Sequence, residues 1–298
     1  MNVFKLSVIA TDVHMIRTRE NFKSLTDSIS PWVSEVDGNF SYYAVCPHCT
    51  NSVEIVHWKT TNTDFPYARH YLKQVIGLGN FNFSAYEQCP YRNRNNITKP
   101  SKDNFRPEGH PVNQGILTLL IKYFDCAVFL LEHALQLRFT PECLLQMLID
   151  FRDAHGWRYM GASMQNIPWI FTCFTLPKSL NNLRLNNEML KVSLLKSKPD
   201  LIFNEHGRIE MVQGDFFNPV FDFYGHTQHI RNGHLTESII FRVSNKYVVL
   251  HEQCIEFDPL KFIKLIKIDD FHLKNIRRAE LVDLAHRVFN GVVDQIIS

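Results

Sequence analysis

The chain has 298 residues, of which 45% are hydrophobic and 21% are charged, and its formal net charge is +2 at pH 7. This composition is typical of a folded globular protein with enough length for one large domain or two ordinary ones, and it excludes a disordered chain. A charge so close to zero excludes a global field that would attract nucleic acid or an anionic membrane, so binding of either would have to be local.

The chain begins with a short apolar stretch that turns polar at Thr11 and Asp12, too early for the core of a signal peptide. The longest candidate for a membrane span, Ile116 to Leu137, is interrupted by charged residues. Seven cysteines, an odd number, argue against a disulfide framework. We therefore expect a reduced, cytoplasmic protein that does not associate with membranes.

Residues 1–92 are predicted to form a small module built around a metal site. A short strand from Val3 to Ile9 comes first, followed by a polar helix from about Arg19 to Ile29. The next feature is a Cys-x2-Cys pair, Cys46 and Cys49, with apolar strand residues on both sides. This is the pattern of a zinc ribbon, in which a β-hairpin presents two thiolates at its tip.

A tetrahedral structural zinc site needs two further ligands. The next candidates along the chain are Cys89 and His70, which we expect on a short helix from Tyr67 to Ile76, although His48 or His57 could replace one of them. Because four protein ligands leave no position for water, the ion would fold the module and catalyse nothing. We interpret the set as a structural Zn²⁺ site formed by Cys46, Cys49, His70 and Cys89.

Two other interpretations of the cysteine pair stay open. A redox-active Cys-x2-Cys pair normally opens a helix after a strand, whereas strand-like residues stand on both sides of this one. Unconnected reduced cysteines are the plainest alternative. The spacing favours zinc over both.

A polar segment, residues 93–111, follows the module and is predicted to be a basic linker or loop. Lysine and arginine side chains at such a place can contact a phosphate backbone, and a solvated connector is the plainer alternative. The candidate nucleic-acid-binding residues are Arg92, Arg94, Lys99 and Lys102.

Residues 112–298 are predicted to form a helical plus antiparallel-sheet domain. Helices are expected at Asn113–Arg138, from Thr140-Pro141 to Gly156, and from Asn166 to Phe174. The hydrophobic period then changes to two, and two closing helices are expected at Pro259–Ile266 and Arg277–Ile297. The predicted strands are Leu201–Phe203, Arg208–Val212, Val220–Phe223, Ser238–Val243 and Tyr247–Leu250. The fold class is therefore α+β: a zinc-ribbon-like module, a helical middle, a small antiparallel sheet and a closing C-terminal helix.

Two constellations in this second region have alternative chemistries. Asp200 and Glu210 are spaced like the acids of a metal-dependent nuclease hairpin of the PD-(D/E)xK type, but the third polar residue, Gln213, stands one position too far for the same strand face. A His-x2-His-x4-His run could hold a metal, although it is expected in a polar loop between strands. Its members are His226, His229 and His234.

The motifs Cys46-Pro-His-Cys49, Ala68-Arg69-His70 and Cys89-Pro90-Tyr91 resemble the zinc-ribbon region of bacterial competence-associated CoiA-like proteins and related mobile-element proteins, over residues 40–92. In that family the zinc region precedes a nuclease-type domain. The resemblance thus implies a bacterial protein of DNA-handling or mobile-element context. Because the Glu-x-Gln or Glu-x-Lys element of that family is absent here, the resemblance does not extend to an active site.

These observations predict a non-enzymatic zinc protein that acts as a nucleic-acid-associated binding or assembly module. The first alternative is a degenerate nuclease that uses Asp200 and Glu210. The second is a protein-protein interaction component with a structural zinc, whose helical middle or closing helix docks a partner.

Overall fold

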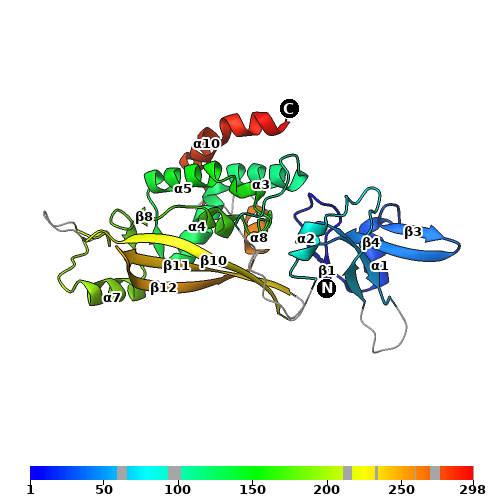
Figure 1. Cartoon of the computed structure of the whole chain (residues 1–298), viewed down its shortest axis with the longest axis horizontal. Helices are drawn as coiled ribbons and strands as arrows, with labels where there is room; N and C mark the ends of the chain where they lie inside the picture. The colour runs from blue at the N-terminus through cyan, green and yellow to red at the C-terminus, as the bar shows by residue number, and fades with distance from the viewer. Residues whose placement is uncertain are drawn as a thin grey trace. The chain divides into compact units, whose positions relative to one another are not determined.

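The computed structural model describes residues 1–58, 66–92, 102–210, 217–231, 234–258, 260–268 and 276–297. It has the predicted mixed α+β class, with helices and small antiparallel sheets (Figure 1). The chain divides into two compact units, each described by itself below. Unit 1 comprises Met1–Pro100 with Thr227–Thr236, and unit 2 comprises Ser101–His226 with Glu237–Ser298.

Unit 1 is built on a four-stranded antiparallel sheet, β3 (Val33–Val36), β4 (Asn39–Val45), β5 (Ser52–Val56) and β6 (Tyr67–His70), in that order. A second pair of short strands joins β1 (Val3–Phe4) to β2 (His14–Met15). Helix α1 (Arg19–Thr26) begins where the Thr18 side chain accepts a hydrogen bond from the Asn21 amide, and helix α2 (Phe83–Glu87) begins at Asn82.

The sequence-based helix at Tyr67–Ile76 is wrong, because its first four residues form strand β6. Antiparallel pairing with β5 fixes these residues in an extended conformation, with Val53 opposite His70 and Ile55 opposite Ala68. His70 therefore lies on the same face of β6 as the buried Ala68. The rings of Phe4, Phe22 and Tyr42 contact one another and form a buried aromatic cluster in unit 1.

The helices of unit 2 start and stop largely at the signals in the sequence. Thr140 caps α5 (Pro141–Asp153) and Pro168 stands in the first turn of α6 (Ile167–Cys173), as predicted. The single helix expected from Asn113 is instead two helices, α3 (Pro111–Lys122) and α4 (Phe124–Leu135), which meet at a bend of 77°. Tyr123 leaves the helical conformation at this bend, with φ −128° and ψ 31°. The other helices among the described residues of this unit are η1 (Gly156–Arg158), α7 (Glu188–Ser197), α8 (Leu260–Ile266) and α10 (Ala279–Ile297).

The larger sheet, whose strands belong to unit 2 except for residues 227–236 of β10 and β11, has the order β12-β11-β10-β8. Figure 1 shows α3, α4 and α5 on one side of the sheet. Helix α7 packs at strand β12 on the same buried face, where Asn187 and Ser193 lie within hydrogen-bonding distance of Gln253 and His251. The inward side chains of the sheet, among them Phe221, Phe241 and Phe257, are almost fully buried and form the core with the helices. The strands are β8 (Lys178–Ser179), β10 (Val220–Arg231), β11 (His234–Asn245) and β12 (Val248–Phe257), and a separate pair joins β7 (Leu137–Arg138) to β9 (Arg184–Leu185).

Two expectations for this region are corrected. The segments predicted as strands at Leu201–Phe203 and Arg208–Val212 form, within residues 201–210, only an isolated bridge between Phe203 and Ile209. The histidine run lies within the long strands β10 and β11 rather than in a loop. The alternation of buried side chains shifts by one residue at Gly225, whose φ is 68°, and then resumes with His226 and Gln228 buried.

Among the residues that the structure describes, no single helix is long and apolar enough to cross a membrane. Helices α3 and α4 reach the length and composition of a span only when they are taken together, across their bend.

Candidate metal centre

The four side chains that the sequence nominated as zinc ligands converge on one point in unit 1. The Sγ atoms of Cys46 and Cys89 lie 3.7 Å apart, and Cys49 Sγ lies 3.2 Å from His70 Nε2. All four ligand atoms lie within 4.8 Å of one another. A tetrahedral zinc with Zn–S bonds of about 2.3 Å would place its sulfurs about 3.8 Å apart, so the arrangement has the dimensions of such a site.

The turn between β4 and β5 presents the first two ligands. It is closed by hydrogen bonds from the Cys46 amide to the Asn51 carbonyl (2.8 Å) and from the Thr50 amide to the Cys46 carbonyl (3.2 Å). Thr50 has a φ of 60°, the left-handed conformation that lets the chain reverse directly after Cys49. The β-hairpin expected around the cysteine pair is thus present, with both thiols in its turn.

The third and fourth ligands come from two other segments. His70 is the last residue of strand β6, and its ring meets that of Tyr86 edge-on at 5.2 Å. Cys89 follows helix α2, where its amide donates to the Tyr86 carbonyl (3.1 Å). His48 and His57, the alternative ligands, are not part of the converging group.

Asn51 is a residue that sequence reasoning missed. Its side chain is almost fully buried, donates to the Asn82 carbonyl (2.9 Å) and accepts from the Asn82 amide (2.6 Å). Asn82 in turn caps α2 by accepting from the Ala85 amide (2.9 Å). Asn51 therefore ties the turn that carries two ligands to the helix that positions Cys89. The available sequence signal was an asparagine two residues after the Cys-x2-Cys pair.

The thiols of the cluster are buried and influence one another. Burial raises the pKa of Cys49 and Cys89 well above the ordinary value, and the neighbouring Cys46 raises both further. Burial acts in the same direction on Cys46, but hydrogen bonds from Cys49 and Cys89 and the nearby His70 outweigh it, so the pKa of Cys46 lies well below its ordinary value. The protein alone therefore favours one thiolate, and a bound dication would favour three.

The donor set fits zinc in type, number and spacing. Three thiolates and one imidazole form a known class of structural site, and soft sulfur ligands favour Zn²⁺ over the hard cations Mg²⁺ and Ca²⁺. Cys46, Cys49 and Cys89 are buried and His70 is half-buried, which gives a closed site.

The predicted phosphate-binding residues differ in their surroundings. The Arg92 guanidinium lies 4.9 Å from the centre of the Tyr86 ring and 3.5 Å from the Glu87 carboxylate. In unit 2, the Lys102 ammonium donates to the Cys173 carbonyl and lies 5.5 Å from the Phe174 ring. Arg94 and Lys99 lie outside the described residues.

Asp200 and Glu210, the acids of the nuclease alternative, are both exposed, and Asp200 pairs with Lys198 at 3.2 Å. Gln213 lies outside the described residues. Within the described part of the chain, the Cys/His cluster is the only group of three or more candidate metal ligands, so no acidic site is assembled there.

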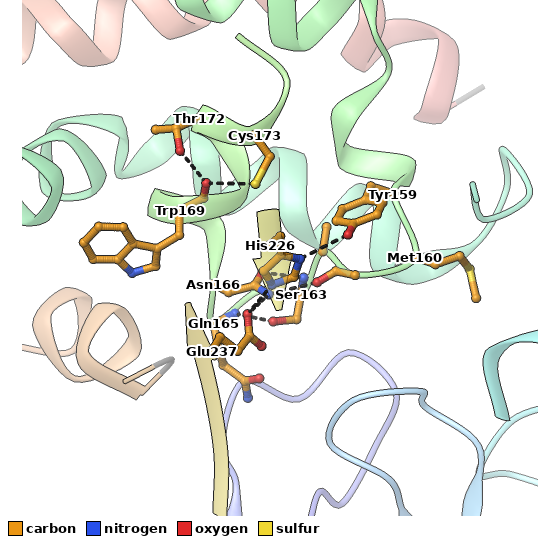
Figure 2. A network of polar contacts seen from close by, with 12 residues as sticks. Tyr159, Met160, Ser163, Gln165, Asn166, Trp169, Thr172, Cys173, His226 and Glu237 are labelled. Carbon is orange, nitrogen blue, oxygen red and sulfur yellow. Dashed lines mark hydrogen bonds and ion pairs between the residues drawn. The ribbon is translucent and has the colours of Figure 1, made fainter. Parts of the chain in front are cut away.

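The first histidine of the His-x2-His-x4-His run, His226 in unit 2, has a structural role. His226 lies between Tyr159 and Glu237 in a buried polar network (Figure 2). Its Nδ1 is 3.1 Å from the Tyr159 hydroxyl and its Nε2 is 3.0 Å from Glu237 Oε2, which also accepts from the Asn166 amide (2.9 Å). Both ring nitrogens are therefore used inside the protein.

Within the described side chains, His226 and His229 belong to no group of three or more candidate metal ligands. The side chain of His234 itself lies outside the described part. The network of Figure 2 instead joins strands β10 and β11 to the segment before α6.

Comparisons with known proteins add no relative: no family model matches the chain, and no curated protein or solved structure is significantly similar to it.

Proposed function

We propose that this chain is a zinc-dependent binding protein whose partner is nucleic acid, in the DNA-handling or mobile-element context of a bacterium. The observation that carries the proposal is the convergence of four ligand atoms within 4.8 Å from three separate segments of unit 1. Zinc is the metal that fits this sulfur-rich donor set.

The proposed role of the zinc is structural. Three thiolates and an imidazole complete a tetrahedron, so no coordination position is left for water or substrate. The ion would join the β4–β5 turn, the end of β6 and the residue after α2, and it would add to the hydrogen bonds by which Asn51 already links the turn to α2. We therefore propose a zinc ribbon that folds around its metal and presents a surface.

Support for nucleic acid comes from the residues that follow the last ligand. Arg92 stands three residues after Cys89, its side chain is 41% exposed, and it stacks on Tyr86. An exposed guanidinium on an aromatic ring can contact phosphate and stack with bases. The sequence adds Arg94 and Lys99 nearby, whereas Lys102 is already engaged by a backbone carbonyl of unit 2.

Metal content of the purified protein tests the first step. We expect one zinc per chain in the wild type and none in Cys46→Ser, with full zinc in Cys254→Ser, because Cys254 is an exposed cysteine of unit 2. His234→Ala should also keep its zinc. Absence of metal from the wild type, or loss of metal in His234→Ala alone, would refute the site.

Salt-dependent binding tests the second step. Fluorescence anisotropy with labelled single-stranded DNA, duplex DNA and RNA should give an affinity that falls with salt. The triple variant Arg92→Gln, Arg94→Gln, Lys99→Gln should bind more weakly, and its salt slope should be smaller by about 0.7–0.9 for each phosphate that is no longer neutralised. A zinc-loaded wild type that binds none of these probes at low salt would exclude nucleic acid while leaving the zinc site intact.

A protein partner is the second candidate function, because unit 2 exposes large apolar side chains. Met189 and Val192 on the outer surface of α7 are 76% and 50% exposed, and Tyr247, in the turn between β11 and β12, is fully exposed. Such side chains are enriched at protein interfaces. Association that does not depend on salt, and that is lost in Met189→Ser with Tyr247→Ser, would favour this candidate.

A further inference from the structure

Unit 2 contains a cavity of about 380 Å³ that the proposed function does not use. It lies where the end of α5, the short helix η1, the segment before α3 and helix α10 come together. Its lining includes Trp157, Val292, His155, Arg152 and Arg158. The volume falls in the lower part of the range of about 300–1,000 Å³ that is usual for small-molecule sites.

The apolar part of the cavity is held rigidly. Trp157 is 5% exposed and packs edge-on against Phe151 at 6.3 Å and against Phe289 at 5.9 Å. The His155 ring lies 5.3 Å from the Trp157 ring, so two aromatic rings border the same space. Such a wall favours a flat apolar body over a strongly hydrated one.

The charged part consists of two arginines whose partners are easily displaced. Arg158 donates through Nε to the Arg106 carbonyl (3.1 Å) and through Nη1 to Glu108 (2.8 Å). The Arg158 side chain is 21% exposed, whereas that of Glu108 is 84% exposed. Arg152 pairs with Asp153, the next residue, and again the acid is the more exposed member, at 60% against 37%.

An incoming anion can therefore replace an exposed carboxylate without moving the guanidinium. Exposed ion pairs contribute little to stability, so little is lost when Glu108 or Asp153 turns to solvent. The Arg106 carbonyl keeps Arg158 in place, and a planar guanidinium binds carboxylate or phosphate with two parallel hydrogen bonds.

We propose that this cavity binds a small aromatic anion, with its ring against Trp157 and its carboxylate or phosphate group between Arg152 and Arg158. The two anionic groups share the chemistry that the arginines recognise. The site is separate from the zinc cluster, since every residue named belongs to unit 2.

Isothermal titration of the full, zinc-loaded chain with benzoate, phenyl phosphate and neutral benzamide tests the proposal. At least one of the two anions should bind with a Kd of about 1 mM or tighter, and benzamide at least tenfold more weakly. Arg152→Gln and Arg158→Gln should each weaken binding by about tenfold or more. Arg184→Gln, an exposed arginine on β9, is the matched control and should bind as the wild type does.

Glu108→Gln provides a test in which the affinity for the anion is expected to rise rather than fall. It removes the anion that competes for Arg158 and should tighten binding, without lowering the melting temperature, because Glu108 is exposed. If Arg158→Gln impairs folding through its contact with the Arg106 carbonyl, Arg152→Gln and Glu108→Gln carry the test. The proposal is overturned if neither anion binds at millimolar concentration, if benzamide binds equally well, or if these variants bind as the wild type does.

Discussion

Asn51 gives the sharpest test of how the metal centre is held. Its buried amide makes two hydrogen bonds to the backbone of Asn82 and lies 3.5 Å from Cys49 Sγ. The substitution Asn51→Ala removes all three contacts and leaves the peptide groups of Asn82 without these partners. The turn that carries Cys46 and Cys49 would then no longer be fixed to the helix that precedes Cys89.

The cost of this substitution follows from the two orphaned peptide groups. A buried polar group without a partner costs about 1–3 kcal/mol, and both groups of Asn82 are half-buried, which gives about 2–3 kcal/mol in total. Small zinc modules fold only with their metal, so a loss of folding free energy is a loss of zinc affinity. At about 1.4 kcal/mol per factor of ten, we expect the zinc affinity to fall about 30- to 150-fold.

Competition with a chromophoric zinc chelator measures this affinity directly. Asn39→Ala is the matched control, because Asn39 is exposed and its amide reaches only the Asp37 carbonyl at 3.4 Å. The control should bind zinc like the wild type. A value for Asn51→Ala within threefold of the wild type would show that Asn51 does not position the ligands.

Three further predictions concern pH and the buried network. Zinc affinity, measured by the same competition, should rise with pH, because thiols whose pKa is raised must release protons to bind the metal. Burial, followed by the nearby Arg106, lowers the pKa of His110 from 6.5 to about 4, and its neutral Nδ1 accepts the Val112 amide at the start of α3. The unfolded state therefore binds a proton more readily than the folded state. With a discount for the partial exposure of the ring, unit 2 should lose about 1–2 kcal/mol of unfolding free energy between pH 6.5 and 4 in urea unfolding. His110→Asn should remove most of this loss. Glu237→Ala should lower the free energy of unfolding by about 3 kcal/mol, because His226 and Asn166 lose a buried hydrogen-bond acceptor. Glu237→Gln, which keeps a side-chain carbonyl oxygen, should lower it clearly less. Equal losses for the two variants would contradict this account.

Features that depend on neighbouring residues could be predicted from the sequence. Thr140 followed by Pro141 determines the start of α5, because a side-chain cap and a fixed φ act within one turn of helix. The hairpin around Cys46 and Cys49 follows from apolar residues on both sides of a tight turn. The choice of His70 and Cys89 as partners was also possible, since a structural zinc needs two further thiol or imidazole ligands and these residues follow the cysteine pair in the chain.

Features that depend on distant partners could not be predicted. Residues 67–70 carry no strong strand signal, and only pairing with β5 makes them a strand. The helix expected from Asn113 bends at Tyr123, and Asp125, just beyond the bend, is fully buried against Arg277 at 2.7 Å, a partner 152 residues away. Sequence periodicity measures local amphipathicity and contains no term for such a contact.

The Cys/His cluster of unit 1 and the buried His226 of unit 2 show most clearly what the sequence determines and what the tertiary structure determines. The sequence by itself determined the donor chemistry of Cys46, Cys49, His70 and Cys89, because three thiols and an imidazole have few other uses when they come together. Only the tertiary structure decided that they do come together. It also decided that His226 does not serve as a ligand but bridges Tyr159 and Glu237, because a buried imidazole must satisfy both nitrogens with whatever groups the fold brings within hydrogen-bonding distance.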